Sequence, residues 1–414
     1  MTMMTPTIQL DFTSAVLDPK ITFTRSLNTA TRINSSGVIE SVNADIARFD
    51  FNPVTLACRG LLIEETRQNV ALYSSEFANA WWVKTEMSVA TATVTAPDGV
   101  ATVEKFEVTN EASIHIVQST LVASSSGTVH SFSVFVKAAE YDFAFIGITD
   151  GATGQAQRRL NLTTGVVDAV NVGGAGSWTN TSAFAEPLKN GWWRFVLTST
   201  QGAGTAVGMQ IIVGDNTGAQ LFTGTTGNGI YVWGAQREIG AFATSYIPTT
   251  TATVTRNADV AAITGTNFSD WWQSSKGGVL VRARPGTVSG TRPWVQFDDG
   301  TANEIIALRG NTTNPELYIV DGGVAQAQID AGTIAANTDY SLTGWWSTND
   351  CKARLDSGAV VTDTSATIPT VTQARIGSDG TNYLNGTIAS LNYYGSFTGQ
   401  IYTRRKNKVI FSLM

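Results

Sequence analysis

The sequence has 414 residues, of which only 14% are charged, against about 25% in an average soluble domain. At roughly 150 residues per domain this length predicts two or three domains, and the many Thr, Ser, Asn and Gly residues favour short strands joined by tight turns. The net charge of −6 gives no basis for binding nucleic acid or an anionic membrane, and no apolar run is long enough to cross a bilayer.

The first segment, residues 1 to 66, carries Pro6, Pro19 and Pro53 among short strand-like stretches. It is too poor in strands for a sandwich of its own, so we predict an attachment segment that another chain or a particle stabilises. The opening residues lack the layout of a signal peptide. A protein that works outside the cell would then need another route, such as release of a virus particle by lysis.

Two full sets of strands follow, in residues 67 to 258 and 259 to 400. The alternating segments that predict strands are residues 131–137, 143–148, 194–198, 209–213 and 278–284. Glycine turns separate such segments, at Asp150-Gly151, Thr164-Gly165, Asn190-Gly191, Asp299-Gly300, Asp321-Gly322 and Asp379-Gly380. The pattern predicts an all-β chain of two antiparallel sandwiches, followed by a basic tail, residues 401 to 414, that we expect to be solvated or in contact with a partner.

The first set of strands has a recognisable frame. Its motifs are Asn69 to Trp81, Ala96-Pro-Asp-Gly99, Asn190-Gly-Trp-Trp-Arg194, Tyr231 to Glu238, Ala243-Thr-Ser-Tyr-Ile-Pro248 and Thr255-Arg-Asn-Ala-Asp259. This frame resembles the carbohydrate-binding-type jelly-roll module of phage and prophage tail and head fibre proteins. The upstream motif Gly60-Leu-Leu-Ile-Glu-Glu65 is similar to the leader that often accompanies that module.

The second set resembles a concanavalin A-like, laminin G-like lectin fold. The residues that carry the resemblance are 279–283, 317–322, 338–346 and 376–391. Such folds often bind calcium through loop carboxylates, which implies Asp298, Asp299, Asp321 and Asp379 as ligands. Turn formation explains the same aspartates equally well.

Catalytic motifs are absent. The two histidines, His115 and His130, have no nucleophile motif nearby, and with two distant cysteines they make no zinc site. Glycosidases of the concanavalin A-like fold carry Glu-x-Asp-x-x-Glu on one strand, and this chain does not. We predict a protein that is not an enzyme, with no catalytic residues and no assigned metal site, calcium being the one cofactor left possible.

Four tryptophan doublets are the strongest functional feature: Trp81-Trp82, Trp192-Trp193, Trp271-Trp272 and Trp345-Trp346. Adjacent side chains on a strand face opposite sides, so each doublet is expected to bury one ring and expose the other, unless core or a module interface covers both. Exposed rings stack on sugars. We predict glycan contacts from Trp192, from Arg194 on the same face, and from Trp82 and Trp345.

These features together predict a virion protein, namely a phage fibre, spike or capsid-decorating protein that binds a bacterial surface polysaccharide. It would join other virion proteins through residues 1 to 66 and assemble as a homotrimer. Two alternatives remain: a purely structural virion protein without glycan binding, and a polysaccharide depolymerase.

Overall fold

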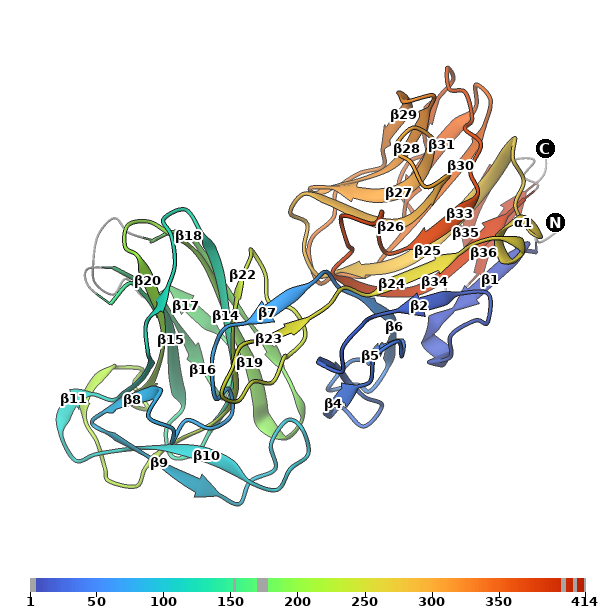
Figure 1. Cartoon of the computed structure of the whole chain (residues 1–414). Helices are drawn as coiled ribbons and strands as arrows, with labels where there is room; N and C mark the ends of the chain where they lie inside the picture. The colour runs from blue at the N-terminus through green and yellow to red at the C-terminus, as the bar shows by residue number, and fades with distance from the viewer. Residues whose placement is uncertain (1–4, 152–153, 170–177, 396–399, 405–407, 413–414) are drawn as a thin grey trace.

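The structure, a computed structural model, describes residues 5–151, 154–169, 178–395, 400–404 and 408–412. The helical elements in this part are the 3-10 turns η1 (Phe12–Ser14) and η2 (Lys189–Gly191) and the α-helix α1 (Thr266–Ser269). No described helix has the length and apolar character needed to cross a membrane. Figure 1 shows two lobes of strands joined by the antiparallel pair β7 (Arg67–Asn69) and β23 (Val254–Arg256). The predicted all-β class is confirmed.

The first lobe is an antiparallel sandwich built from the chain between β7 and β23. One sheet, called the junction sheet, has the order β18 (Trp178–Pro187), β19 (Trp192–Gln201), β14 (Val129–Ala138), β22 (Gly229–Ile239), β10 (Val103–Val108), β9 (Met87–Ala92). The other, the distal sheet, has the order β17 (Val167–Ala169), β16 (Gln155–Asn161), β15 (Phe143–Thr149), β20 (Ala206–Gly214), β12 (Ile116–Ser119), β8 (Trp82–Thr85), with β13 (Val122–Ala123) also paired to β20. A small sheet pairs β11 (Ala112–Ile114) with β21 (Leu221–Thr223).

The second lobe is also an antiparallel sandwich. Its eight-stranded sheet has the order β32 (Val361–Asp363), β31 (Cys351–Leu355), β30 (Tyr340–Ser347), β25 (Lys276–Pro285), β34 (Gly386–Tyr394), β6 (Cys58–Ile63), β5 (Phe49–Phe51), with β1 (Ile8–Asp11) also paired to β34. The opposite sheet has the order β2 (Thr22–Thr24), β24 (Val260–Ile263), β33 (Gln373–Ile376), β26 (Thr291–Asp298), β27 (Ile305–Asn311), β28 (Asn314–Asp321), β29 (Val324–Asp330).

Alternation and turn chemistry explain these elements. All five predicted strand segments lie in strands, namely β14, β15, β19, β20 and β25. On β25, for example, Val279, Val281 and Ala283 point into the core of the second sandwich while Arg282 between them is only half-buried. The glycines of the six predicted turns all have positive φ, which a glycine adopts without a Cβ clash.

The predicted attachment segment, residues 1 to 66, is corrected by this topology. Its strands β1, β5 and β6 belong to the eight-stranded sheet, and β2 belongs to the opposite sheet. Leu10, Phe12, Phe23, Leu61 and Ile63 are buried in the core of the second sandwich. The segment therefore completes that sandwich, and the first sandwich is inserted between its two parts. No local pattern indicates this, because β1, β2 and β6 pair with strands more than 200 residues away, for example Ile8 with Tyr393.

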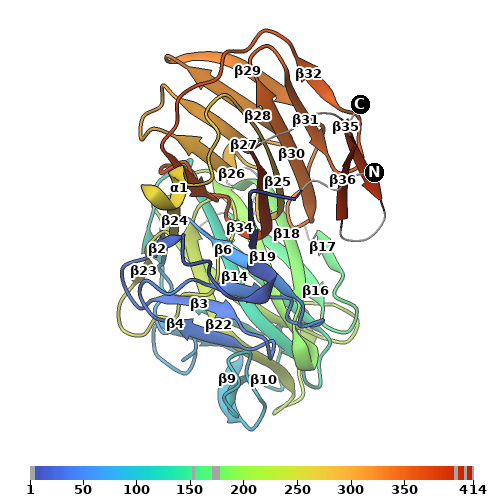
Figure 2. The same cartoon turned by 90° about the vertical axis from the view of Figure 1, so that its right-hand side faces the viewer.

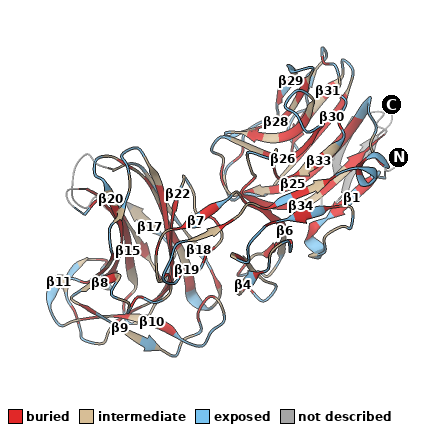
Figure 3. Cartoon of the chain, viewed as in Figure 1, coloured by how far each residue is buried: buried red, intermediate tan, exposed pale blue. Residues whose placement is uncertain are grey.

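A third core lies between the lobes. The hairpin of β3 (Ala30–Ile33) and β4 (Ile39–Val42) covers the outer face of the junction sheet, as Figure 2 shows. Ile39 of this hairpin packs in one cluster with Phe135, Trp192, Trp233 and Tyr246. Figure 3 shows that burial extends through both lobes and along the strands that join them. The junction sheet is consequently covered on both faces over much of β14 and β22.

The predicted basic tail, residues 401 to 414, contains two strands. They are β35 (Gln400–Arg404) and β36 (Lys408–Ser412), paired as an antiparallel hairpin beyond β34. Arg405 and Lys406 lie outside the described residues.

Candidate functional site

Trp192 lies on the same face of β19 as Arg194, as predicted, but its ring is buried. It is 2% exposed and belongs to the core between the lobes, where its Nε1 donates a hydrogen bond to the Thr95 carbonyl at 2.9 Å. The expectation of an exposed, glycan-stacking ring was wrong. Alternation fixes which face a side chain occupies, but the cover on this face comes from distant segments that contain Ile39 and Ala96.

Trp82 and Trp345, the other predicted stacking rings, are also buried. Trp82 is 0% exposed, packs on Phe77 and donates from Nε1 to the Tyr73 carbonyl at 3.0 Å, whereas Trp345 is 6% exposed. Of the neighbouring tryptophans in these two doublets, Trp81 is half-buried and Trp346 is buried. The tryptophan doublets therefore build the cores and their edges, which corrects the proposed role in binding.

Replacing Trp192 by alanine is expected to lower the free energy of unfolding by about 3 to 5 kcal/mol, because the substitution leaves a large cavity and removes the partner of a carbonyl. Chemical denaturation measures this change. Ile239→Ala, at a side chain that is 63% exposed, is the control and should cost no more than about 0.5 kcal/mol. A loss below about 1 kcal/mol at Trp192 would contradict its place in the core.

Arg194, the remaining predicted site residue, lines a cavity between the two lobes. The cavity has a volume of about 160 Å³. One wall is the outer face of the junction sheet, where Phe184, Glu186 and Leu188 accompany Arg194. The facing wall comes from the second sandwich and its N-terminal strands: Asp50, Arg59, Arg284, Asn337 and Thr387.

The first wall combines an exposed aromatic ring with a positive charge. Phe184 is 45% exposed on β18, which is the edge strand of the junction sheet. Its register partner is Val196, and Glu186 is opposite Arg194. The Arg194 guanidinium lies 5.6 Å from the centre of the Phe135 ring and donates to the Thr244 carbonyl at 2.5 Å.

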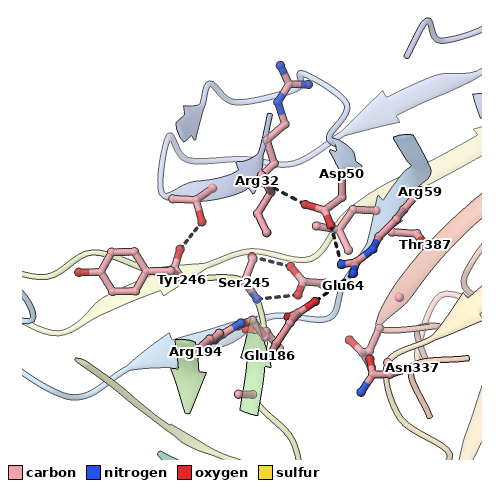
Figure 4. A pocket seen from close by; sticks show the side chains of 18 of the residues that line it. Arg32, Asp50, Arg59, Glu64, Glu186, Arg194, Ser245, Tyr246, Asn337 and Thr387 are labelled. Atoms are coloured by element: carbon pink, nitrogen blue, oxygen red, sulfur yellow. Dashed lines mark hydrogen bonds and ion pairs between the residues drawn. The ribbon is translucent and has the colours of Figure 1, made fainter. Parts of the chain in front are cut away.

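The facing wall carries an ion-pair bridge that closes one side of the cavity. Arg59 lies between two carboxylates, with Nη2 at 3.0 Å from Glu186 Oε1 and Nη1 at 3.7 Å from Asp50 Oδ2 (Figure 4). Burial raises the pKa of Asp50 to about 6, although the Ile33 N–H at 2.9 Å and Arg59 both favour its charged form. Asp50 is consequently a carboxylate that changes charge near neutral pH.

Thr387 gives this wall an unsatisfied hydroxyl. The residue is 4% exposed, and its Oγ1 has no hydrogen-bond partner among the described residues. A buried hydroxyl without a partner costs free energy. Its oxygen is covered in this structure, so a bound ligand would recover that cost after a rotation of the Thr387 side chain toward the cavity. Asn337, on the same wall, adds an exposed amide.

A buried ion network lies behind Glu64, one of the residues that line the cavity. Asp259 pairs with Arg25 at 3.0 Å and with Arg48, and Arg48 also pairs with Glu64 at 2.7 Å. Arg256 lies 3.6 Å from Glu64, and the side chains of all five residues are between 0% and 7% exposed. Burial alone would raise the pKa of Glu64, but Arg256 and Arg48 hold it well below its usual range.

This network accounts for two of the motifs singled out in the sequence. Glu64 belongs to Gly60-Leu-Leu-Ile-Glu-Glu65, and Arg256 and Asp259 belong to Thr255-Arg-Asn-Ala-Asp259. The two motifs therefore carry charges that meet where the chain crosses between the lobes. Ser245 joins the first sandwich to the network by donating to both Glu64 oxygens at 2.7 Å. The role of these motifs is to hold the lobes together around the cavity.

Comparisons with known proteins find likenesses among solved structures alone. No family model matches the chain, and a search of curated proteins finds no match. Among solved structures, domains LG4-5 of the mouse laminin alpha1 chain are similar at 10% identity, with 66% of this chain and 84% of that chain covered and a TM-score of 0.22. A TM-score this low carries no weight for fold or function.

His130 lies beside a serine, but the pair is not arranged for catalysis. Arg237 Nη1 lies 3.4 Å from His130 Nδ1, and because a guanidinium only donates, the ring proton is on Nε2. That nitrogen faces Ser124 Oγ at 3.0 Å, while Ser124 donates to Gln201 Oε1 at 2.6 Å. Burial, with help from Arg237, also lowers the pKa of His130 to about 4. The imidazole therefore presents a donor to the hydroxyl and cannot remove its proton.

The four aspartates proposed as calcium ligands are not brought together. Asp298 is buried against Arg375 at 2.9 Å, Asp299 and Asp379 accept hydrogen bonds from their own turns, and Asp321 bonds to Thr367. Within the described part of the chain, no three His, Cys, Asp or Glu side chains form a cluster that could hold a metal ion. These aspartates act in turns and ion pairs, the alternative left open by the sequence.

Proposed function

We propose that this chain is a glycan-binding protein and that the cavity between its lobes is the binding site. The observation that carries the proposal is the combination of the exposed Phe184 ring on one wall with the partnerless Thr387 hydroxyl on the other. A sugar ring has an apolar face that stacks on an aromatic ring and hydroxyls that both donate and accept. A concave site with an apolar wall and a few placed polar groups suits such a ligand.

We further propose that the protein belongs to a bacteriophage particle and binds a bacterial surface polysaccharide. This part is supported by the jelly-roll motifs, from Asn69 to Asp259, that resemble phage fibre modules. A single sugar site typically binds at around a millimolar dissociation constant, worth about 4 kcal/mol. Adhesion then needs several copies acting together, so a homotrimer is part of the proposal. Because the strands of residues 1 to 66 belong to the sheets of the second sandwich, attachment to the particle would have to use the outward surface of this segment or another part of the molecule.

Replacing Phe184 by alanine is expected to weaken glycan binding by about tenfold, the loss of one aromatic stacking contact of about 1.4 kcal/mol. A binding assay against bacterial polysaccharides, such as biolayer interferometry on an immobilised panel, measures it. Because the ring is exposed, the melting temperature should stay within a few degrees of the wild type.

The matched control is Leu221→Ala, at an exposed apolar side chain on β21 away from the cavity. It should leave binding unchanged. Equal binding by wild type and the Phe184 variant would show that the cavity is not the site. Binding to no polysaccharide at all would favour a purely structural protein.

A further inference from the structure

We propose, on the basis of the glycan-binding function above, that the ligand is an acidic saccharide and that Arg194 binds its carboxylate. The proposal starts from the charges that line the cavity: four arginines, Arg32, Arg59, Arg194 and Arg284, and three carboxylates, Asp50, Glu64 and Glu186. What matters is which of these charges are neutralised by protein partners.

Three of the arginines have a carboxylate within ion-pair distance. Arg32 pairs with Glu40 at 2.8 Å and Arg284 with Asp339 at 3.6 Å. Arg59 is held between Glu186 and Asp50. Figure 4 also shows the Arg32 side chain directed away from the middle of the cavity.

Arg194 is the exception. No carboxylate of the described residues lies within 4.0 Å of its guanidinium, since Glu186, its register partner, is turned to Arg59 at 3.0 Å. Its Nη2 donates to the Thr244 carbonyl and to Ser133 Oγ at 3.1 Å, and its Nε is buried without a partner. These neutral contacts orient the guanidinium and leave its positive charge without a carboxylate partner, so the carboxylate of a ligand would supply the missing negative charge through a charge-assisted contact.

Asp50 makes the same cavity sensitive to pH. The charged groups that face it are Arg59 on β6, Glu186 on β18 and Glu64 beyond the end of β6, with the Cys58 thiol also close. With its pKa raised to about 6 by burial, Asp50 is charged at about pH 7.5 and largely protonated at about pH 5.5. Lowering the pH therefore removes one negative charge from the cavity. An anionic sugar, whose own carboxyl stays ionised at about pH 5.5, then binds more tightly.

The test uses bacterial polysaccharides that contain hexuronic acids, each in its native form and in a carboxyl-reduced form that keeps the linkages. Wild-type protein should bind a native form at least about tenfold more tightly than its reduced form, the worth of one charge-assisted contact. Arg194→Gln, which removes the positive charge and keeps a polar side chain, should lose this preference. Binding of the native form should strengthen by roughly threefold to tenfold from about pH 7.5 to about pH 5.5, as expected for one unit charge about 10 Å away in a screened site.

Asp50→Asn is the control for the pH effect. It should bind the acidic form at about pH 7.5 as tightly as the wild type does at about pH 5.5, with little further change. Equal affinity of the wild type for native and reduced forms would overturn the inference and leave the glycan function intact. A loss of both forms in equal measure by the Arg194 variant would also overturn it, whereas wild-type protein that binds neither form of any polysaccharide would overturn the glycan function itself.

Discussion

Deleting residues 1 to 66 is expected to prevent the second sandwich from folding. The segment supplies three strands of the eight-stranded sheet and one strand of the opposite sheet. Five of its side chains, Leu10, Phe12, Phe23, Leu61 and Ile63, are buried in the core. At about 1.5 to 3 kcal/mol for each, these side chains alone contribute about 10 kcal/mol, as much as the whole stability of a typical domain.

Deleting the first sandwich instead tests whether the loss of folding is specific to residues 1 to 66 or follows from any large deletion. β7 and β23 are antiparallel, with Asn69 opposite Val254, so an Asn-Gly turn between these two residues would replace residues 70–253 by a two-residue hairpin. The resulting chain keeps both parts of the second sandwich and is expected to fold, with a strand-type circular dichroism spectrum and a cooperative thermal transition. If the chain without residues 1 to 66 folds instead and the chain without residues 70–253 does not, the first sandwich is not an insertion in the second.

The second large effect is expected from Asp259→Ala. The carboxylate is completely buried and pairs with Arg25 and Arg48, and its removal leaves two buried guanidinium groups without that partner. Breaking a buried ion pair in this way costs about 3 to 5 kcal/mol, mostly from the uncompensated charge. Urea denaturation should therefore show a midpoint far below that of the wild type.

Asp168→Ala is the matched control, because Asp168 forms a part-exposed ion pair with Arg159 at 2.8 Å. Its loss should cost no more than about 1 kcal/mol. Similar small losses for both variants would mean that the network between the lobes does not stabilise the protein.

The sequence predicts the strands of this protein well and their partners poorly. Alternation located β14, β15, β19, β20 and β25, and the glycine turns have the expected backbone, because both properties depend on neighbouring residues. The pairing of β1 with β34 depends on a contact across the whole chain, and no local pattern encodes it. The segment taken for an attachment arm therefore proved to be part of a core.

In the candidate site, too, local features were predicted and long-range contacts were not. Trp192 and Arg194 lie on one face, as predicted, but hydrophobic cover from the β3–β4 hairpin buries the first, whereas the second lines the cavity. Asp50, Arg59 and Glu186 were not singled out, because they come from strands that meet only in the folded chain. The one usable signal was Glu64 in its motif, a charged residue directly after the apolar run Leu61-Leu62-Ile63.

A crystal structure of the protein with an oligosaccharide cut from a polysaccharide that it binds would test the central claim most directly. We predict density for a sugar in the cavity between the lobes, with its ring against Phe184, a hydroxyl on Thr387 and a carboxylate on Arg194. Sugar density at another surface, with this cavity empty and its side chains unmoved, would contradict the proposed site.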